Sequence, residues 1–101
     1  MIKEVMSVNE INSGDVLVDF YTPSCAPCRA LSPILEELSQ EFQQVKVAKV
    51  DVANNPEMSQ SFGIMSVPTV MFMRNSQVKR VVRGLSNKEF LKSMIRECIN
   101  E

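Results

Sequence analysis

Two cysteines, Cys25 and Cys28, are separated by two residues and can close reversibly into a disulfide. They lie between an apolar run at residues 16–21 and the start of a helical pattern. The free N–H groups and the dipole at a helix N-terminus favour negative charge, and so favour the thiolate of Cys25. Because the thiolate is the nucleophile, this pair at this junction is typical of an intracellular redox motif.

The missing residue types narrow the chemistry. The chain has no histidine, which excludes Cys–His and Ser–His catalysis. Three cysteines without histidine argue against a four-ligand structural zinc site within one chain. The three glycines do not form a phosphate-binding loop, since they are scattered as Gly14, Gly63 and Gly84. The cysteine pair therefore remains the principal reactive group.

Length and composition indicate what kind of protein carries this pair. The chain has 101 residues, and we expect one domain over residues 1–101. Apolar residues make up 45% and charged residues 23%, which is typical of a globular domain. The net charge of −1 without a basic cluster argues against a nucleic-acid partner. No apolar run approaches the ~20 residues that span a membrane, and no signal-peptide pattern opens the chain, so we expect a cytoplasmic protein.

Strand-like and helical segments alternate along the chain. We expect strands at residues 2–6, 16–21, 45–52, 69–73 and 78–82. We expect a short helical turn at residues 9–12, helices at residues 25–42 and 56–63, and a last helix that runs to residue 99. The run at 16–21 is nearly all apolar, as in a central strand covered on both faces. The order predicts a mixed sheet with helices on both faces.

The last helix carries its own signals. Ser86 followed by Glu89 fits a capping box, which predicts that Ser86 caps this helix. One apolar face is expected to hold Phe90, Leu91, Met94, Ile95, Cys98 and Ile99. On that face Cys98 is interpreted as a small buried hydrophobic residue, with a regulatory or dimer-forming thiol as the alternative.

Several segments, in this order and at these separations, resemble the thioredoxin family. They are residues 16–20, 25–29, 32–38, 47–51, 62–64, 67–69 and 84–86. The resemblance covers nearly the whole chain and implies an α/β thioredoxin fold, with a central mixed five-stranded sheet flanked by four helices. The chain departs from the usual Trp-Cys-Gly-Pro-Cys at Ser24 and Ala26, and Tyr21 replaces a usual tryptophan. It therefore resembles an atypical member.

The resemblance implies a role for each cysteine. Cys25 would attack a substrate disulfide and form a mixed disulfide, which Cys28 would then resolve to release reduced substrate. Pro27 would hold the turn between them and donate no competing N–H. The alternative is a static disulfide or an inert buried pair.

Two charged residues are implied to assist. Asp19 matches a family aspartate that is buried behind the second cysteine and assists its proton transfer, and burial raises the pKa of a carboxyl group. Lys49 matches a lysine near that aspartate and could form an ion pair with it. The alternatives are a strand aspartate turned to solvent and an ordinary solvated lysine.

Substrate is implied to bind around a cis-proline. Pro68 matches the family's cis-proline and would expose the Val67 backbone, which could pair with an extended substrate segment. The alternative is a trans proline at a strand start. The expected substrate-binding surface comprises Ala26, Pro27, Met65, Ser66, Val67, Pro68, Arg83 and Gly84.

The resemblance also implies partners. The expected function is reduction of protein disulfides by a monomer, recharged by a thioredoxin reductase that draws electrons from NADPH. No bound cofactor is needed, because the Cys25–Cys28 disulfide carries the electrons. Three alternatives stay open: a reductant dedicated to few clients, a non-enzymatic binding module, and a metal or iron–sulfur site formed by two chains.

Overall fold

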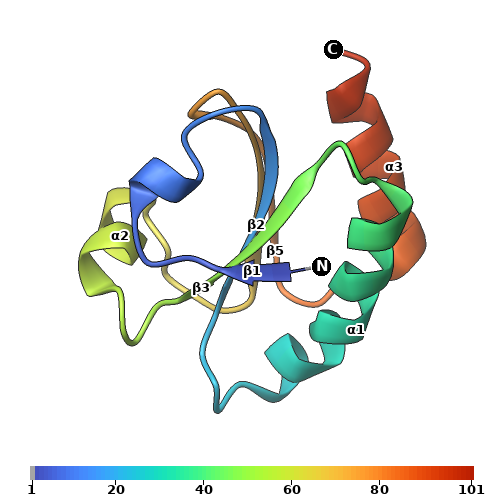
Figure 1. Cartoon of the computed structure of the whole chain (residues 1–101). Helices are drawn as coiled ribbons and strands as arrows, with labels where there is room; N and C mark the ends of the chain where they lie inside the picture. Colours follow the sequence, from blue (N-terminus) through green and yellow to red (C-terminus); the bar gives the residue numbers. More distant parts are fainter. Residues whose placement is uncertain (1) are drawn as a thin grey trace.

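The structure is a computed structural model that describes residues 2–101. Its strands are β1 (Ile2–Glu4), β2 (Asp15–Tyr21), β3 (Lys46–Asp51), β4 (Thr69–Arg74) and β5 (Gln77–Arg83). Its helices are the 3₁₀ turn η1 (Val8–Glu10) and the α-helices α1 (Ala26–Glu41), α2 (Pro56–Ser61) and α3 (Lys88–Ile99) (Figure 1).

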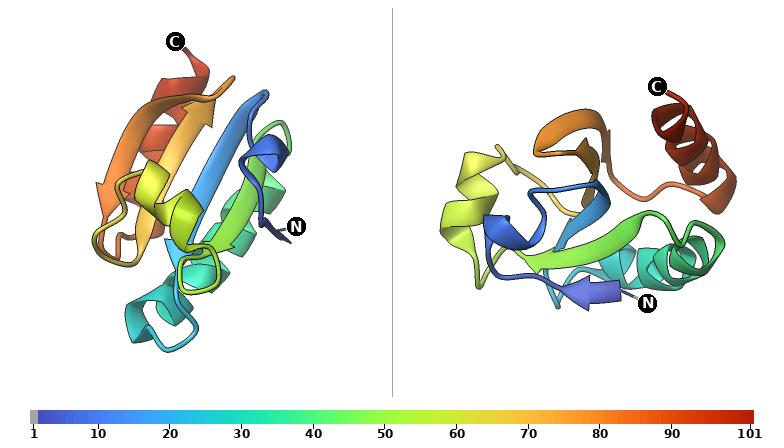
Figure 2. Two further views of the ribbon diagram at one scale, coloured as in Figure 1. Left: turned by 90° about the vertical axis from the view of Figure 1, so that its left-hand side faces the viewer. Right: turned by 45° about the horizontal axis from the view of Figure 1, so that its top comes forward.

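The five strands form one mixed sheet in the order β1-β3-β2-β4-β5. The strands β1, β3 and β2 are parallel, whereas β4 runs antiparallel to both β2 and β5. Helices α1 and α3 cover one face of the sheet, and α2 with η1 lies on the other (Figures 1 and 2). This confirms the predicted mixed sheet with helices on both faces.

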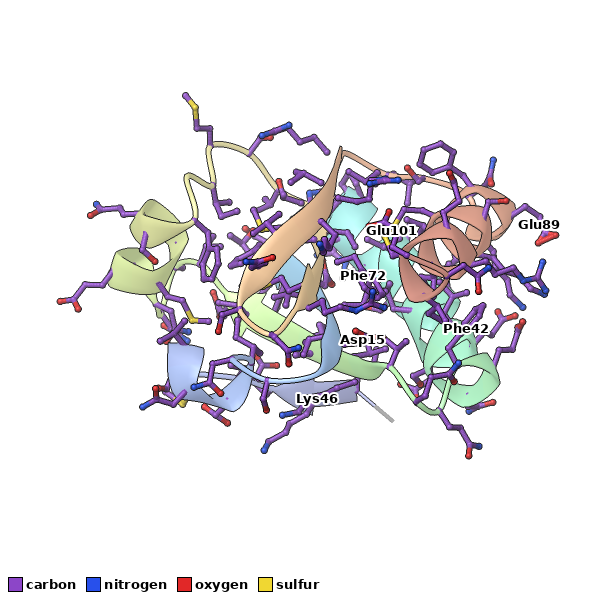
Figure 3. The ribbon with its side chains drawn as sticks, turned by 90° about the horizontal axis from the view of Figure 1, so that it is seen from above. Asp15, Phe42, Lys46, Phe72, Glu89 and Glu101 are labelled. Carbon is purple, nitrogen blue, oxygen red and sulfur yellow. A yellow bond between two sulfur atoms is a disulfide. The ribbon has the colours of Figure 1, made fainter. Side chains whose placement is uncertain are left out.

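Alternation along the central strand builds two cores. Leu17 packs into the core beneath α1 and α3, together with Phe42 and Phe72 (Figure 3). Its neighbours Val16 and Val18 pack into the core beneath α2. Because β2 has a strand on each side and helices on each face, its interior is completely buried, as the apolar run predicted.

The short helical turn expected at residues 9–12 is present one residue earlier in the chain, but it is not an α-helix, so the structure has three α-helices where four helices were expected. The segment forms only the single 3₁₀ turn η1, capped by Ser7, whose side chain accepts the Asn9 N–H. Glu10 accepts from the backbone of Met6 and Ser7, which ends β1 at Glu4 instead of residue 6. So short a segment forms too few helical hydrogen bonds to offset the cost of helix nucleation.

The predicted capping box of the last helix is also wrong, because the helix begins one residue later. Asn87 is the N-cap, and its Oδ1 accepts the Phe90 N–H at 2.8 Å. Glu89 points away from the protein (Figure 3). The buried face consists of Leu91, Met94, Ile95 and Cys98. Phe90 lies outside this face and is 55% exposed.

The corrected cap gives a stability prediction. Asn87→Ala leaves the first turn of α3 without its side-chain acceptor, and should cost about 1 kcal/mol of unfolding free energy. Urea denaturation measures this cost, with Ser86→Ala as the matched control that should change the midpoint little. An equal or larger loss in Ser86→Ala would show that the helix is capped at Ser86 in solution.

Candidate functional site

The two cysteines flank the first turn of α1 and are joined as a disulfide in the structure. Cys25 is the N-cap residue and is half-buried, whereas Cys28 is only 2% exposed. The Cys28 N–H donates to the Cys25 Sγ at 3.2 Å. A helix N–H aimed at this sulfur would stabilise a thiolate there once the disulfide is reduced. The arrangement leaves Cys25 partly accessible to solvent and encloses Cys28.

The segment between β2 and α1 fixes the position of Cys25. The Cys25 N–H donates to the Thr22 carbonyl at 3.2 Å, and the Arg29 side chain donates to the Pro23 carbonyl at 2.9 Å. Pro27 occupies the first turn of α1, where a backbone N–H would have no partner within the helix. The chain is therefore held at both ends of the turn that presents Cys25.

The Val67–Pro68 peptide bond is cis, as the resemblance implied, and Pro68 is buried. Its carbonyl accepts the Gly84 N–H at 2.8 Å. Thr69, the next residue, pairs with Phe20 near the end of β2. Because β4 starts where β2 ends, Pro68 lies at the end of the sheet from which the chain leads to Cys25.

Most residues of the expected substrate-binding surface are exposed. Ala26, Pro27, Met65, Ser66 and Arg83 are exposed, whereas Val67 and Gly84 are half-buried. Met65 is 96% exposed, which leaves a long apolar side chain in solvent. The hydrogen bond from Gly84 to Pro68 joins the segment after β5 to the segment before β4.

Leu85 is an exposed apolar residue beside Gly84 that was not among the residues predicted for this surface. It follows Gly84 directly and is 53% exposed. Its signal in the sequence was a lone apolar residue between Gly84 and Ser86, in a segment without helical or strand periodicity. Exposed apolar side chains grouped near one site are typical of a protein-binding surface.

Asp19 lies in the middle of β2 and is completely buried, so the alternative of a solvent-facing aspartate is wrong. Neither carboxyl oxygen has a hydrogen-bond partner within residues 2–101. The pKa of Asp19 is raised to about 7, chiefly by loss of hydration; the charge of Lys49 opposes this increase and the charge of Glu4 adds to it. Asp19 shares a sheet face with Leu17, which packs against α1, the helix that contains Cys28.

Lys49 pairs with Asp19 in the sheet register, yet the expected ion pair is absent. Across the described chain, no oxygen of Asp19 lies within 4.0 Å of the Lys49 ammonium. The ammonium instead donates to Ser32 Oγ at 3.4 Å and lies 4.3 Å from the centre of the Tyr21 ring. Lys49 thus acts on Asp19 through its charge without direct contact.

Tyr21 and Glu4 were not predicted to belong to this site. The Tyr21 hydroxyl donates to Glu4 Oε2 at 2.8 Å. Burial together with this bond to a carboxylate raises the pKa of Tyr21, so the hydroxyl stays protonated and keeps donating. A side-chain contact between β1 and β2 therefore lies beside Asp19 and Lys49.

Three further features of the structure bear on the predictions made from the sequence. Within residues 2–101, no three side chains among cysteine, aspartate and glutamate gather as metal ligands. Cys98 is buried in α3, and loss of hydration raises the pKa of its thiol. In the part of the chain that the structure describes, no helix has both the length and the apolar character to cross a membrane.

Comparison with known proteins identifies the family. The thioredoxin family model matches residues 4–97. The chain is 37% identical to a thioredoxin of Listeria monocytogenes, over 98% of this chain and all of that protein. It is 41% identical to a thioredoxin of Chlamydia pneumoniae, over 94% of this chain and 96% of that one. A mutant thioredoxin from Halobacterium salinarum superposes with a TM-score of 0.89 at 30% identity, covering 95% of this chain and 88% of its own. The chain therefore belongs to the thioredoxin family and is a thiol–disulfide oxidoreductase that acts on protein disulfides.

Proposed function

We propose that this protein reduces client disulfides by two successive exchange reactions. The Cys25 thiolate attacks one client sulfur, forms a mixed disulfide and expels the other client sulfur as a thiolate, which takes up a proton. The Cys28 thiolate then attacks the Cys25 sulfur and expels the first client sulfur, also as a thiolate. Two electrons pass to the client, and the Cys25–Cys28 disulfide remains. The observation that carries this order is the helix N–H aimed at Cys25, with Cys28 enclosed behind it.

Asp19 is proposed to accept the proton of Cys28 in the second exchange. A base is most effective when its pKa lies near the working pH, and burial raises the pKa of Asp19 to about 7. Asp19 lies on the face that α1 covers, and its oxygens have no partner elsewhere in residues 2–101. Both oxygens are therefore free to take the proton, directly or through water, and Lys49 tunes this step by its charge.

The client is proposed to bind as an extended segment beside Val67. Within residues 2–101, neither the N–H nor the C=O of Val67 is bonded to another part of the chain. Backbone groups that have no partner within the protein can pair with an extended segment of another chain. Pro68 flanks the dithiol, and the surface around it would be completed by Ala26, Pro27, Met65, Ser66, Arg83 and Gly84.

The oxidised protein must be reduced again between turnovers. We propose a thioredoxin reductase, supplied by NADPH, as the electron donor, and protein disulfides as acceptors. The protein would work as a single-domain monomer in electron transport and cell redox homeostasis. Its proposed location is the cytoplasm, where disulfides are usually transient and catalytic. The dithiol itself carries the electrons.

A narrow client set is the second candidate, favoured by the surroundings of Cys25. Ser24 is small and exposed, so it leaves the surroundings of Cys25 open where the family usually has tryptophan, and the exposed Ala26 adds a methyl group where the family usually has glycine. Rates measured with insulin and with individual candidate clients would separate the two. Similar rates favour the general reductase, whereas rapid reduction of a few proteins alone favours the dedicated one.

The test of the proposed function is reduction of insulin, with either NADPH and thioredoxin reductase or dithiothreitol as the electron source. Cys25→Ser should reduce turnover to the uncatalysed rate, whereas Cys98→Ser should retain it. Turnover with dithiothreitol, but not with NADPH and thioredoxin reductase, would indicate that this protein uses a different reductase. Full activity of Cys25→Ser, or no catalysis with either electron source, would contradict the proposal.

A further inference from the structure

Three ionisable residues form one row across three neighbouring strands. In the register of the sheet, Glu4 on β1 pairs with Lys49 on β3, and Lys49 pairs with Asp19 on β2. Neighbouring strands lie about 4.8 Å apart, and residues paired in this way point to the same face of the sheet. The row therefore places one ammonium between two carboxyl groups, on the face that α1 covers.

Side chains beside the row hold its members in place. Tyr21, two residues after Asp19, donates its hydroxyl to Glu4 Oε2 at 2.8 Å. The face of the same ring lies 4.3 Å from the Lys49 ammonium, a distance at which a cation is attracted to the ring. Ser32 on α1 accepts from that ammonium at 3.4 Å. One tyrosine thus contacts both the outer carboxylate and the central ammonium.

We propose that Glu4 is a positioning residue for proton transfer: its carboxylate, held by Tyr21, offsets the charge of Lys49 and so favours the protonated form of Asp19. This inference rests on the proposed role of Asp19 as the proton acceptor for Cys28. It assigns a part in the reaction to the edge strand β1, far along the chain from the cysteines.

The reason lies in the charge balance of the row. When Asp19 is protonated, the charges of Glu4 and Lys49 cancel. When Asp19 is ionised, the row carries one net negative charge, and the Asp19 end of the row is completely buried whereas the Glu4 end is exposed. Removing Glu4 would leave Lys49 to neutralise Asp19 alone, which favours the ionised form. The other titratable groups on the face of the sheet that holds Asp19 are Asp15 and Tyr21 at the two ends of β2 and Asp51 at the end of β3. Asp15 is paired with Arg74 of β4, and the residue of β4 opposite Asp19 is the apolar Val70. On α1, Cys28 is buried, whereas the charged residues are exposed: Arg29, Glu36, Glu37 and Glu41.

The test is the pKa of Asp19 in the reduced protein, followed through the ¹³C chemical shift of its carboxyl carbon. Glu4→Gln keeps an acceptor for Tyr21 and removes the charge, so the Asp19 pKa should fall by roughly half a unit. Tyr21→Phe keeps the ring and releases the Glu4 carboxylate, and should shift the pKa in the same direction by less. Glu57→Gln, an exposed change on α2 at the opposite face, is the control and should leave the pKa unchanged.

These variants also separate the inference from its alternatives. If Glu4 only fastens β1 to the sheet, Glu4→Gln and Tyr21→Phe would lower the urea midpoint while the Asp19 pKa stays constant, and the inference would be wrong. The NMR titration requires no turnover, so it can succeed or fail independently of the insulin assay. If the pKa shifts as expected, the pH profile of client release by Cys28 should shift with it.

Discussion

Replacing Cys28 by serine should convert the protein from a catalyst into a covalent trap. Cys25 keeps its place at the N-terminus of α1 and can still attack a client disulfide. The hydroxyl that replaces the Cys28 thiol cannot attack the resulting mixed disulfide, so the client stays attached. Intact-protein mass measurement under non-reducing conditions should show a species equal to one protein plus one client, and dithiothreitol should release both.

The third cysteine supplies the control for this experiment. Cys98 is buried in α3 and its thiol pKa is raised, so it should neither form nor resolve the mixed disulfide. Cys28→Ser and the double variant with Cys98→Ser should therefore trap equal amounts of client. Trapping that requires Cys98, or continued turnover in Cys28→Ser, would contradict the assignment of Cys28 as the resolving residue.

The parts of the fold that could be predicted are those with strong local patterns. The apolar run at 16–21 predicted a central strand, and the spacing of Leu31, Leu35 and Leu38 predicted a helix. Each pattern can be buried in only one type of secondary structure, and both predictions were correct. The first residue of α3 was harder to predict, because Ser86 and Asn87 are adjacent and both residue types are favourable N-caps. Packing of Leu91 and Met94 against the sheet selects the cap, and a local pattern does not contain that contact.

The sequence predicted those parts of the site that involve residues close together along the chain. Cys25 and Cys28 are adjacent on one helical turn, so their relationship is local. The contacts of Lys49 depend instead on the register between β2 and β3 and on the approach of α1. The Lys49 ammonium was predicted to form an ion pair with Asp19, but it instead contacts the ring of Tyr21 and the hydroxyl of Ser32. Glu4 could not be placed at all without knowing that β1 pairs with β3.

Replacing Asp19 by asparagine should make the protein more stable and less active. The pKa of Asp19 rises from its ordinary 3.8 to about 7 in the folded protein. Between pH 4 and 7 the folded state therefore keeps a proton that the unfolded chain loses, and the wild-type stability falls as pH rises through this window. Above pH 7 the full penalty of the buried charge is present, which corresponds to roughly 4 kcal/mol.

Asp19→Asn removes this titration while nearly preserving the shape of the side chain. Urea denaturation should show equal stability for both proteins near pH 4 and a gain for Asp19→Asn of up to about 4 kcal/mol at pH 8. Asp51→Asn is the matched control on β3. Asp51 is also buried, but its oxygens accept from the Ala53 N–H and the Asn54 amide, so this replacement should not stabilise the protein.

The same substitution should slow client release, because Cys28 would lose its proton acceptor. A positioned base contributes about 10²-fold or more, so the second exchange should slow by roughly that factor at pH 7 while attack by Cys25 is little changed. Stopped-flow mixing with a disulfide client resolves the two steps. Opposite effects on stability and on the second step would show that the buried charge is retained for chemistry. Stabilisation with an unchanged second step would leave Asp19 without a part in the reaction.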